Sequence, residues 1–227
     1  MKTFEQAINA SAASIKKVVN FDANKDILLP LDFTSANAEL TSEILNNTDL
    51  FSEWVDKKLI NNKARYGIGG YNEHRTIYTR SAHFDTGEEP RCLHLGVDIW
   101  APADTPIFTF HDASVHSFAN NNNYGDYGAT IILSYDLDGF KFHTLYGHLS
   151  LASLKGLEEG KFIPAGKPFA TLGAKEENGN WPPHLHFQII MDMEGFQGDY
   201  PGVCKFSERE PYLNNCPDPN LILAYNF

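Results

Sequence analysis

The sequence contains few cysteines, and their number argues against a secreted scaffold held together by disulfides. Only three occur among 227 residues, Cys92, Cys204 and Cys216. An odd number with no paired framework suits a reducing compartment. The N-terminus also lacks the continuous apolar segment and the small-residue cleavage site of a signal peptide. We therefore expect a cytoplasmic protein, and an exported one only if a leader has been removed.

Basic residues and long apolar runs are also scarce. The 18 Lys and Arg stand against 29 Asp and Glu, which gives a formal net charge of −11. With no basic stripe to neutralise phosphates, a nucleic-acid partner is not expected. No apolar run approaches the ~20 residues that a membrane span needs, so no membrane segment is expected either. The sequence makes no prediction of the oligomeric state.

The segment 182–190, Pro-Pro-His-Leu-His-Phe-Gln-Ile-Ile, has the alternation typical of a β-strand. Because His184 and His186 are two residues apart, we expect both imidazoles on one face. Leu185 and Phe187 then lie on the other face. Such a strand suits a sheet that covers a core on one side and lines a site on the other. The alternative is a pair of solvent-facing histidines on an edge strand, since His-x-His is a short and common pattern.

A second alternating segment carries His94 and Asp98 on one face, together with Cys92. In a straight strand His94 and Asp98 lie roughly 13 Å apart, at about 3.3 Å per residue, which is too far to share one ion. We expect a bulge or bend at Gly96, between them. With His186 as a third ligand, two imidazoles and one carboxylate suit a catalytic zinc with an open position. Cys92 is the rival ligand, and a thiolate would favour a tighter and less reactive site.

A third cluster lies in the predicted strand 142–150. Period-two alternation places Thr144, Tyr146 and His148 on one face of this strand. His148 is the candidate site residue of the three. His143 lies on the opposite face, where we expect it to pack against neighbours or to be exposed.

Three motifs, taken in chain order, resemble those of the lysostaphin/LytM-type zinc metallopeptidases: His94-Leu-Gly-Val-Asp98, Tyr146-Gly-His148-Leu-Ser and His184-Leu-His186-Phe. The resemblance covers roughly residues 82–190, and the ordered set is far more specific than any one motif. It implies a mainly β fold, with an antiparallel β-sheet metallopeptidase domain of the duplicated hybrid motif type. It also implies one Zn²⁺ per chain, with ligands His94, Asp98 and His186. The two catalytic histidines that are not ligands correspond to His148 and His184.

Zinc in an open site lowers the pKa of a bound water and polarises a substrate carbonyl. Amide hydrolysis also needs a base for the water and a donor for the oxyanion or the leaving amine. The sequence has no His-Glu-x-x-His helix, so the glutamate base of that class of zinc protease is missing. We expect His148 and His184 to fill these roles, and the sequence leaves open which of them does which.

Four further residues are candidates for substrate binding: Tyr146, Arg75, Arg80 and Trp181. The two arginines lie in a polar, aromatic stretch before the first motif and are candidates to bind a charged end of the substrate. The alternative for this stretch is a solvated strand. Trp181 stands where the related family commonly has a small residue, so we expect its indole, at the mouth of the cleft, to narrow the range of substrates.

The chain divides into three predicted parts. Residues 1–65 form a mainly helical extension packed on the core, 66–195 the peptidase domain, and 196–227 a tail that wraps the surface. Within the extension, apolar spacing predicts three helices, over 3–20, over 35–46 with Thr34 or Ser35 as its cap, and from Thr48 onwards. Between the first two, Pro30 limits the apolar run 27–33 to an edge strand or an irregular segment. The glycine-rich run 67–70 reads as a turn.

The sequence thus predicts a zinc-dependent metalloendopeptidase that hydrolyses peptide (amide) bonds, with peptidoglycan-type or related small peptides as substrates. The missing export signal conflicts with a cell-wall substrate, and two alternatives therefore stay open. One is a zinc hydrolase that acts on a non-peptide amide or an ester. The other is a non-catalytic binding module on the same scaffold.

Overall fold

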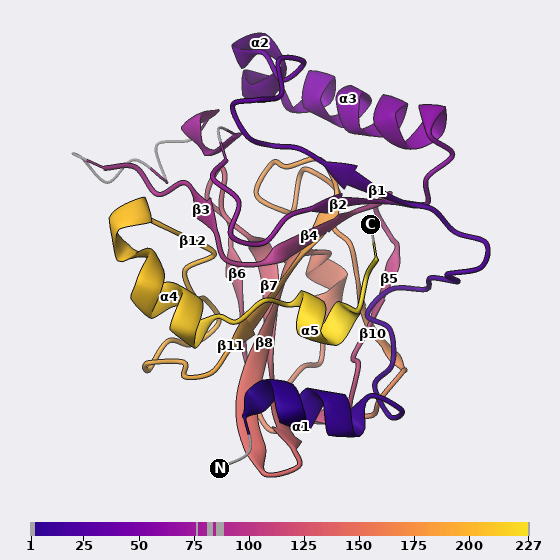
Figure 1. Cartoon of the computed structure of the whole chain (residues 1–227), viewed down its shortest axis with the longest axis vertical. Helices are drawn as coiled ribbons and strands as arrows, with labels where there is room; N and C mark the ends of the chain where they lie inside the picture. The colour runs from indigo at the N-terminus through magenta and orange to yellow at the C-terminus, as the bar shows by residue number, and fades with distance from the viewer. Residues whose placement is uncertain (1–2, 76, 81–83, 85–88, 227) are drawn as a thin grey trace.

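A computed structural model describes residues 3–75, 77–80, 84 and 89–226 of the chain. Its centre is an eight-stranded sheet in the order β1-β2-β4-β11-β8-β7-β6-β9 (Figure 1). The strands, in that order, are Leu28–Leu31, Tyr66–Gly69, Val97–Trp100, His184–Ile190, Phe140–Leu149, Gly128–Leu137, Ala113–Asn121 and Phe162–Ile163. Every neighbouring pair is antiparallel except β1 and β2, which are parallel. The mainly β, antiparallel architecture is as predicted.

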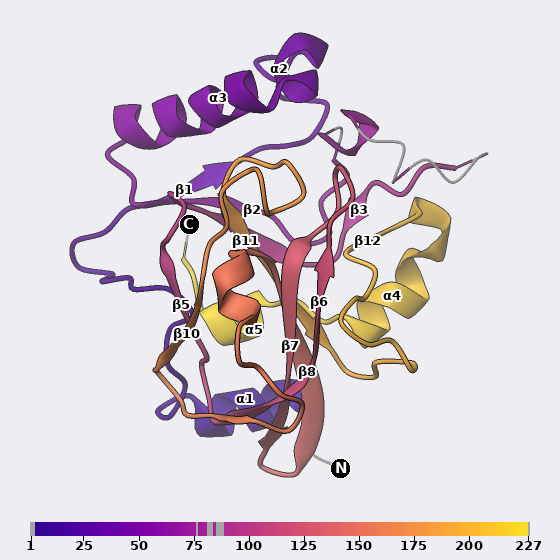
Figure 2. The same ribbon diagram turned by 180° about the vertical axis from the view of Figure 1, so that it is seen from behind.

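Two short ribbons and several helices complete the fold. The ribbons pair β5 (Pro106–Phe108) with β10 (Pro168–Thr171) and β3 (Leu93–His94) with β12 (Val203–Cys204). The helices are α1 (Phe4–Ser11), α2 (Ser42–Asn46), α3 (Thr48–Asn61), α4 (Arg209–Asn215) and α5 (Asn220–Leu223), with 3₁₀ turns η1 (Ile77–Arg80), η3 (Leu151–Leu154) and η4 (Phe206–Glu208). Helices α2 and α3 lie beyond the edge strand β1, and α1 lies at the opposite end of the molecule (Figures 1 and 2). No helix in the described part of the chain combines the length and apolar character needed to cross a membrane.

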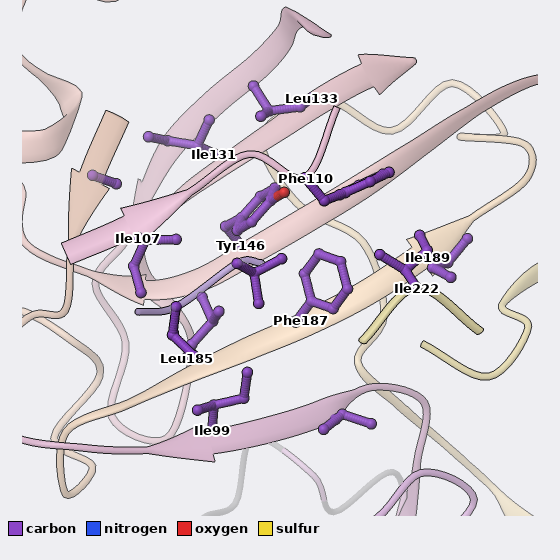
Figure 3. Close-up of a cluster of buried hydrophobic side chains, with 14 of the residues drawn as sticks. Ile99, Ile107, Phe110, Ile131, Leu133, Tyr146, Leu185, Phe187, Ile189 and Ile222 are labelled. Atoms are coloured by element: carbon purple, nitrogen blue, oxygen red, sulfur yellow. The ribbon is translucent and has the colours of Figure 1, made fainter. Parts of the chain in front are cut away.

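Strand β11 separates the core from the site. Its Leu185, Phe187 and Ile189 project into the main apolar cluster, where Figure 3 shows them beside Tyr146 and Ile99. All five side chains are fully buried. The opposite face of the strand carries the two histidines of the His-x-His motif. The strand is therefore central and fully buried, so the edge-strand alternative is wrong.

The first predicted helix is much shorter than expected. It covers only Phe4–Ser11, with Thr3 and Gln6 forming a capping box at its start. The β-branched pair Val18 and Val19 is buried instead in extended backbone, where Val18 O accepts a hydrogen bond from Phe108 N and Val19 bridges Ile107. In residues 12–20 the hydrogen bonds with β5 thus stabilise extended backbone, although the apolar spacing favours a helix.

The second predicted helix is also shorter, and its cap is Thr41, neither Thr34 nor Ser35. Local side-chain bonds occupy the residues before it, because Asp32 accepts from Thr34 N and Asn37 accepts from Glu39 N. Such bonds compete with helix formation. The third helix begins at Thr48 as predicted, with Asn47 as its cap. The extension thus contributes α2 and α3 on one side, α1 at the opposite end, and the edge strand β1 of the sheet.

The glycine-rich run 67–70 is wrongly predicted as a turn, because Tyr66–Gly69 forms the buried strand β2. A Cβ at Gly67 would lie 2.5 Å from Leu31 Cδ1, and one at Gly69 would lie 2.5 Å from Arg75 Nη2. These glycines allow side chains from neighbouring segments to approach the backbone closely.

Candidate metal centre and active site

Two adjacent strands and one bend bring His94, Asp98 and His186 together. Asp98 on β4 and His186 on β11 are directly opposite each other in the antiparallel register. His94 ends β3, and the chain leaves the strand at Leu95 and Gly96 before β4 begins, so the bend predicted at Gly96 is present. A glycine is required at this bend, since a Cβ on residue 96 would lie 2.7 Å from the imidazole of His186.

The three side chains present their donor atoms to one point. His94 Nε2 lies 3.0 Å from His186 Nδ1 and 3.3 Å from Asp98 Oδ1, and the last two atoms are 3.2 Å apart. Donors about 2.0–2.2 Å from a tetrahedral ion are roughly 3.3–3.6 Å from one another. All three residues are buried. Among the described residues, these three form the one cluster of His, Cys, Asp or Glu side chains whose donor atoms are close enough to hold a metal ion.

The outward nitrogen of each of these imidazoles has its own acceptor. His94 Nδ1 lies 2.8 Å from the carbonyl oxygen of Gly70, and His186 Nε2 lies 2.8 Å from Gln188 Oε1. Both nitrogens must be protonated to donate to these oxygens, so the nitrogens that face each other carry lone pairs. Two lone pairs 3.0 Å apart repel each other unless a cation lies between them. The residues therefore fit a divalent metal such as zinc.

The carboxylate of Asp98 is held by an arginine. Arg75 Nη1 donates to Asp98 Oδ2 over 2.5 Å, which leaves Oδ1 directed at the two imidazoles. Burial alone would raise the pKa of Asp98, but the charges of His94 and Arg75 hold that pKa well below its usual range. Of the two, the guanidinium is charged at every relevant pH. Asp98 is thus anionic at neutral pH, the form in which a carboxylate can bind a metal ion.

His148 and His184 lie beside this centre, with ring centroids 4.1 Å apart. His148 Nδ1 donates to the carbonyl of Asn178 and His184 Nδ1 to that of Pro182, each over 2.8 Å. Each side chain thereby has its Nε2 free as a proton acceptor. Trp100 stacks on His184 at 4.0 Å and fixes the plane of its ring.

Burial favours the neutral form of three of these histidines, His94, His148 and His184. It lowers the pKa of His94 and of His184 to about 4. Burial, followed by the charge of His184, holds the pKa of His148 well below its ordinary value. Neutral imidazoles are what both metal ligation and proton acceptance require.

The structure places Tyr146 on the wrong face for the predicted substrate contact. Its side chain is fully buried in the main core, where Figure 3 shows it, and its hydroxyl bonds with that of Tyr135 over 2.9 Å. The cause is an irregularity in the β7–β8 pairing between Ala129 and Ile131, opposite which β8 carries an additional residue. His148 has a φ of 61° there and turns to the site, while Tyr146 stays in the core.

The other three candidates for substrate binding lie in different surroundings. Arg75 is buried and bonded to Asp98 and Glu73, so it is not available to a charged substrate end, and the solvated-strand alternative is equally wrong for it. Arg80 ends η1, and its side chain lies outside the described residues. Trp181 lines the cavity beside His148, with ring centroids 6.3 Å apart. The rival ligand Cys92 instead has its Sγ 3.0 Å from His74 Nε2.

A cavity of about 220 Å³ opens over the site. His148, His184, His186 and Asp98 form part of its wall, and aromatic side chains form much of the rest: Tyr78, Phe84, Trp100, Tyr127, Trp181, Phe196 and Tyr200. The tail reaches this cavity as well, through residues 199–203. It is therefore not a surface wrap alone, because β12 pairs with β3 and Val203 lies opposite His94.

Two contributors to the site were not predicted as site residues. Tyr127 lies between two of the histidines, with its ring centroid 5.6 Å from that of His148 and 5.1 Å from that of His186. Gln188 supports His186 as described above. Alternation along β11 points to Gln188, which shares the face of His186, whereas Tyr127 lies in a loop with no periodic signal.

Three buried residues that could hold a metal ion lie on an antiparallel sheet, with two further histidines beside them. This arrangement fits the chemistry of a metal-dependent hydrolase. Residues 93–197 match the model of Peptidase family M23. Over these residues the chain is similar to the lysostaphin/LytM-type metallopeptidases. The match covers somewhat less than half of the chain. No curated protein matches it.

Three solved structures illustrate the range of the likeness. The catalytic domain of lysostaphin from Staphylococcus simulans is 22% identical, with a TM-score of 0.42, over 72% of this chain and 98% of that one. A zinc-containing peptidase from Vibrio cholerae is 24% identical, with a TM-score of 0.35 over 43% of this chain. The catalytic domain of the prophage-encoded M23 protein EnpA from Enterococcus faecalis is 19% identical, with a TM-score of 0.37. The match covers 50% of this chain and 78% of that one. This chain covers 27% of the Vibrio peptidase.

Proposed function

We propose that this protein is a zinc-dependent metalloendopeptidase. Its metal ligands would be His94, Asp98 and His186, with one Zn²⁺ per chain. The observation that carries this proposal is the convergence of three buried donor atoms at 3.0, 3.2 and 3.3 Å, each with its outer partner. When bound, zinc would supply a Lewis acid that lowers the pKa of a water and polarises the scissile carbonyl.

His148 and His184 are proposed to move the protons of the reaction. Each has its Nδ1 proton committed to a backbone carbonyl, so its Nε2 is the atom that accepts a proton. Once protonated, the same Nε2 becomes a donor, either to the developing oxyanion or to the leaving amine. The depressed pKa values of both imidazoles favour a rapid return of that proton. Both side chains are largely buried in the wall of the cavity, which limits their contact with bulk water.

The proposed substrates are peptides of the peptidoglycan type, or related small peptides. Support comes from the M23 match of residues 93–197. A further support is the cavity, whose largely aromatic wall includes Trp181 and Tyr127 and suits a peptide backbone pressed between flat side chains.

The test combines metal analysis with peptide cleavage. We expect one zinc per chain, and cleavage of muropeptide fractions or short synthetic peptides with products identified by mass. His148→Ala and His184→Ala should each retain zinc but lower the cleavage rate by about 10²–10⁴-fold, the usual contribution of one acid–base group.

His111→Ala is the matched control, because His111 does not line the cavity. It should cleave at the wild-type rate. A zinc-loaded protein whose rate is unaffected by both active-site changes would exclude the proposed mechanism. Turnover of esters or small amides with inert peptides would exclude the proposed substrate class.

A further inference from the structure

Arg75 is a charged residue whose side chain is fully enclosed, with 1% relative exposure. It lies outside the segment 93–197 that matches the peptidase family. Its guanidinium donates to several acceptors at once: Asp98 Oδ2 at 2.5 Å, Glu73 Oε2 at 2.7 Å, Gly70 O at 3.2 Å and Tyr78 Oη at 3.3 Å. A planar fork of five N–H groups can make such a set of bonds, and a lysine ammonium cannot.

Two of these acceptors are part of the proposed metal centre: Asp98 is one of its ligands, and the Gly70 carbonyl accepts a hydrogen bond from another, His94. By holding Asp98 Oδ2, Arg75 leaves only Oδ1 for the metal. The carbonyl of Gly70 accepts from Arg75 Nη2 and also from His94 Nδ1. One side chain thereby fixes the carboxylate of one ligand and the carbonyl that orients another.

The charges of this network favour a cation at the centre. Glu73 and Asp98 together contribute two negative charges, and Arg75 contributes one positive charge. With Arg75 and Asp98 buried and Glu73 partly buried, the set carries a net charge of −1. A buried excess charge is costly unless a counter-charge is near it. A divalent ion among His94, Asp98 and His186 provides that counter-charge.

The N-terminal extension holds the arginine from behind. The ring of Phe33 lies under the guanidinium, 5.1 Å from its centre, and Phe33 N donates to Glu73 Oε1 at 3.3 Å. Phe33 also packs on Trp100, with centroids 5.1 Å apart, and Trp100 stacks on His184. A residue of the extension therefore contacts the supports of a metal ligand and of a catalytic histidine.

We propose that Arg75 is a positioning residue of the metal centre, which holds Asp98 as a ligand through one oxygen and fixes the orientation of His94 through Gly70. The proposal rests on the metal site of the proposed function and adds a residue to it from outside the family segment. It differs from a purely structural ion pair in one consequence: loss of Arg75 must change metal coordination as well as stability.

The test uses Co²⁺ as a spectroscopic probe of the full-length protein freed of metal. In Arg75→Met the second oxygen of Asp98 is released and the carbonyl of Gly70 loses a donor. We expect Co²⁺ affinity to fall by about 10- to 100-fold, the usual effect of removing a partner of a metal ligand. The visible absorption of the bound Co²⁺ should also lose intensity, because a carboxylate that binds through both oxygens raises the coordination number.

Arg65→Met is the matched control, since Arg65 pairs with Asp26 on the surface and not with the site. It should match the wild type in affinity and spectrum. Arg75→Lys keeps the charge but loses the fork, so it should fall between the wild type and Arg75→Met. It also carries the test if Arg75→Met fails to fold.

Two results would overturn the proposal. Wild-type affinity and spectrum in a folded Arg75→Met, or in Arg75→Lys where Arg75→Met does not fold, would reduce Arg75 to a structural ion pair. Absence of Co²⁺ binding in the wild type itself would remove the metal centre, and Arg75's role with it. The first result leaves the proposed function intact, and the second does not.

Discussion

Gly96 is the residue on which the geometry of the metal site depends most directly. Any Cβ there would lie 2.7 Å from His186 and 2.9 Å from the carbonyl oxygen of Phe187, and neither neighbour is a flexible side-chain end. We predict that Gly96→Ala displaces His186, lowers zinc affinity, and costs about 1–3 kcal/mol of stability through overpacking. Competition titration with a chelator and urea unfolding would measure the two effects. Unchanged zinc affinity would show that the strand shifts without moving the imidazole.

His143 is predicted to make the protein less stable in mild acid. Its Nδ1 is buried without a hydrogen-bond partner in the described structure, and its ring centroid lies 4.8 Å from that of His116. Burial, followed by the charge of His116, lowers the pKa of His143, and the Ile190 carbonyl and Asp192 oppose this only in part. In the unfolded chain a histidine titrates near pH 6.5.

The unfolded state therefore binds this proton at a higher pH than the folded state does. The stabilisation is fully present above about pH 6.5 and is lost as the pH falls below that value. In His143→Leu this contribution disappears, so the free energy of unfolding should fall less between pH 7 and pH 5 than in the wild type. Denaturant unfolding at several pH values measures this, and equal slopes for the two proteins would contradict it.

Among the elements, the edge strand β1 and the residues directly after it join the N-terminal extension to the sheet. Phe33 is fully buried and contacts the rings of Phe51, Trp54 and Trp100. We predict that Phe33→Ala costs about 3–5 kcal/mol of unfolding free energy, as is usual for removal of an enclosed ring. Phe162→Ala is the control, because Phe162 is 62% exposed and should change stability by less than about 0.5 kcal/mol. Urea unfolding compares the two, and similar values would mean that the extension packs loosely.

Alternation predicted the site where the strands are regular. Along β11 it placed His184 and His186 on one face, and they lie there. It failed in β8, where the irregularity opposite Ala129 and Ile131 sends His148 to the site and leaves Tyr146 in the core. Local pattern carries no information on a bulge of this kind, since the additional residue is defined only by the pairing with β7.

Arg75 shows a second limit of sequence reasoning. The sequence around it is polar and predicted either a surface strand or contact with a substrate. Its burial depends on Phe33 from the extension and on Asp98 from the sheet, which are far from it in sequence. An isolated charge gives no local sign that two distant segments will enclose it. The resemblance of the three motifs to those of the lysostaphin/LytM type, by contrast, predicted which five side chains converge, and their roles stay predictions.

For the molecule as a whole, metal binding should contribute to folding stability. The three proposed ligands converge only in the folded chain, so an ion that binds there stabilises the folded state by mass action. Free zinc at about 100 times its dissociation constant should add about 2.7 kcal/mol at neutral pH. Thermal unfolding with chelator and after addition of zinc measures this difference. Identical transitions in the two conditions would contradict a metal centre built from these residues.

Finally, residues 1–65 are predicted to be part of the folding unit and not a removable appendage. Truncation before Tyr66 would remove β1, leave β2 as an exposed edge, and uncover the aromatic cluster that contains Trp100 and Trp181. An unpaired edge beside exposed apolar surface promotes aggregation. We expect the truncated chain to be insoluble or to lack a cooperative thermal transition, and co-expression of residues 1–65 as a separate chain to restore both. A soluble truncated protein with a cooperative transition and wild-type zinc affinity would show that the sheet and the metal centre form without Phe33, and that the extension merely covers them.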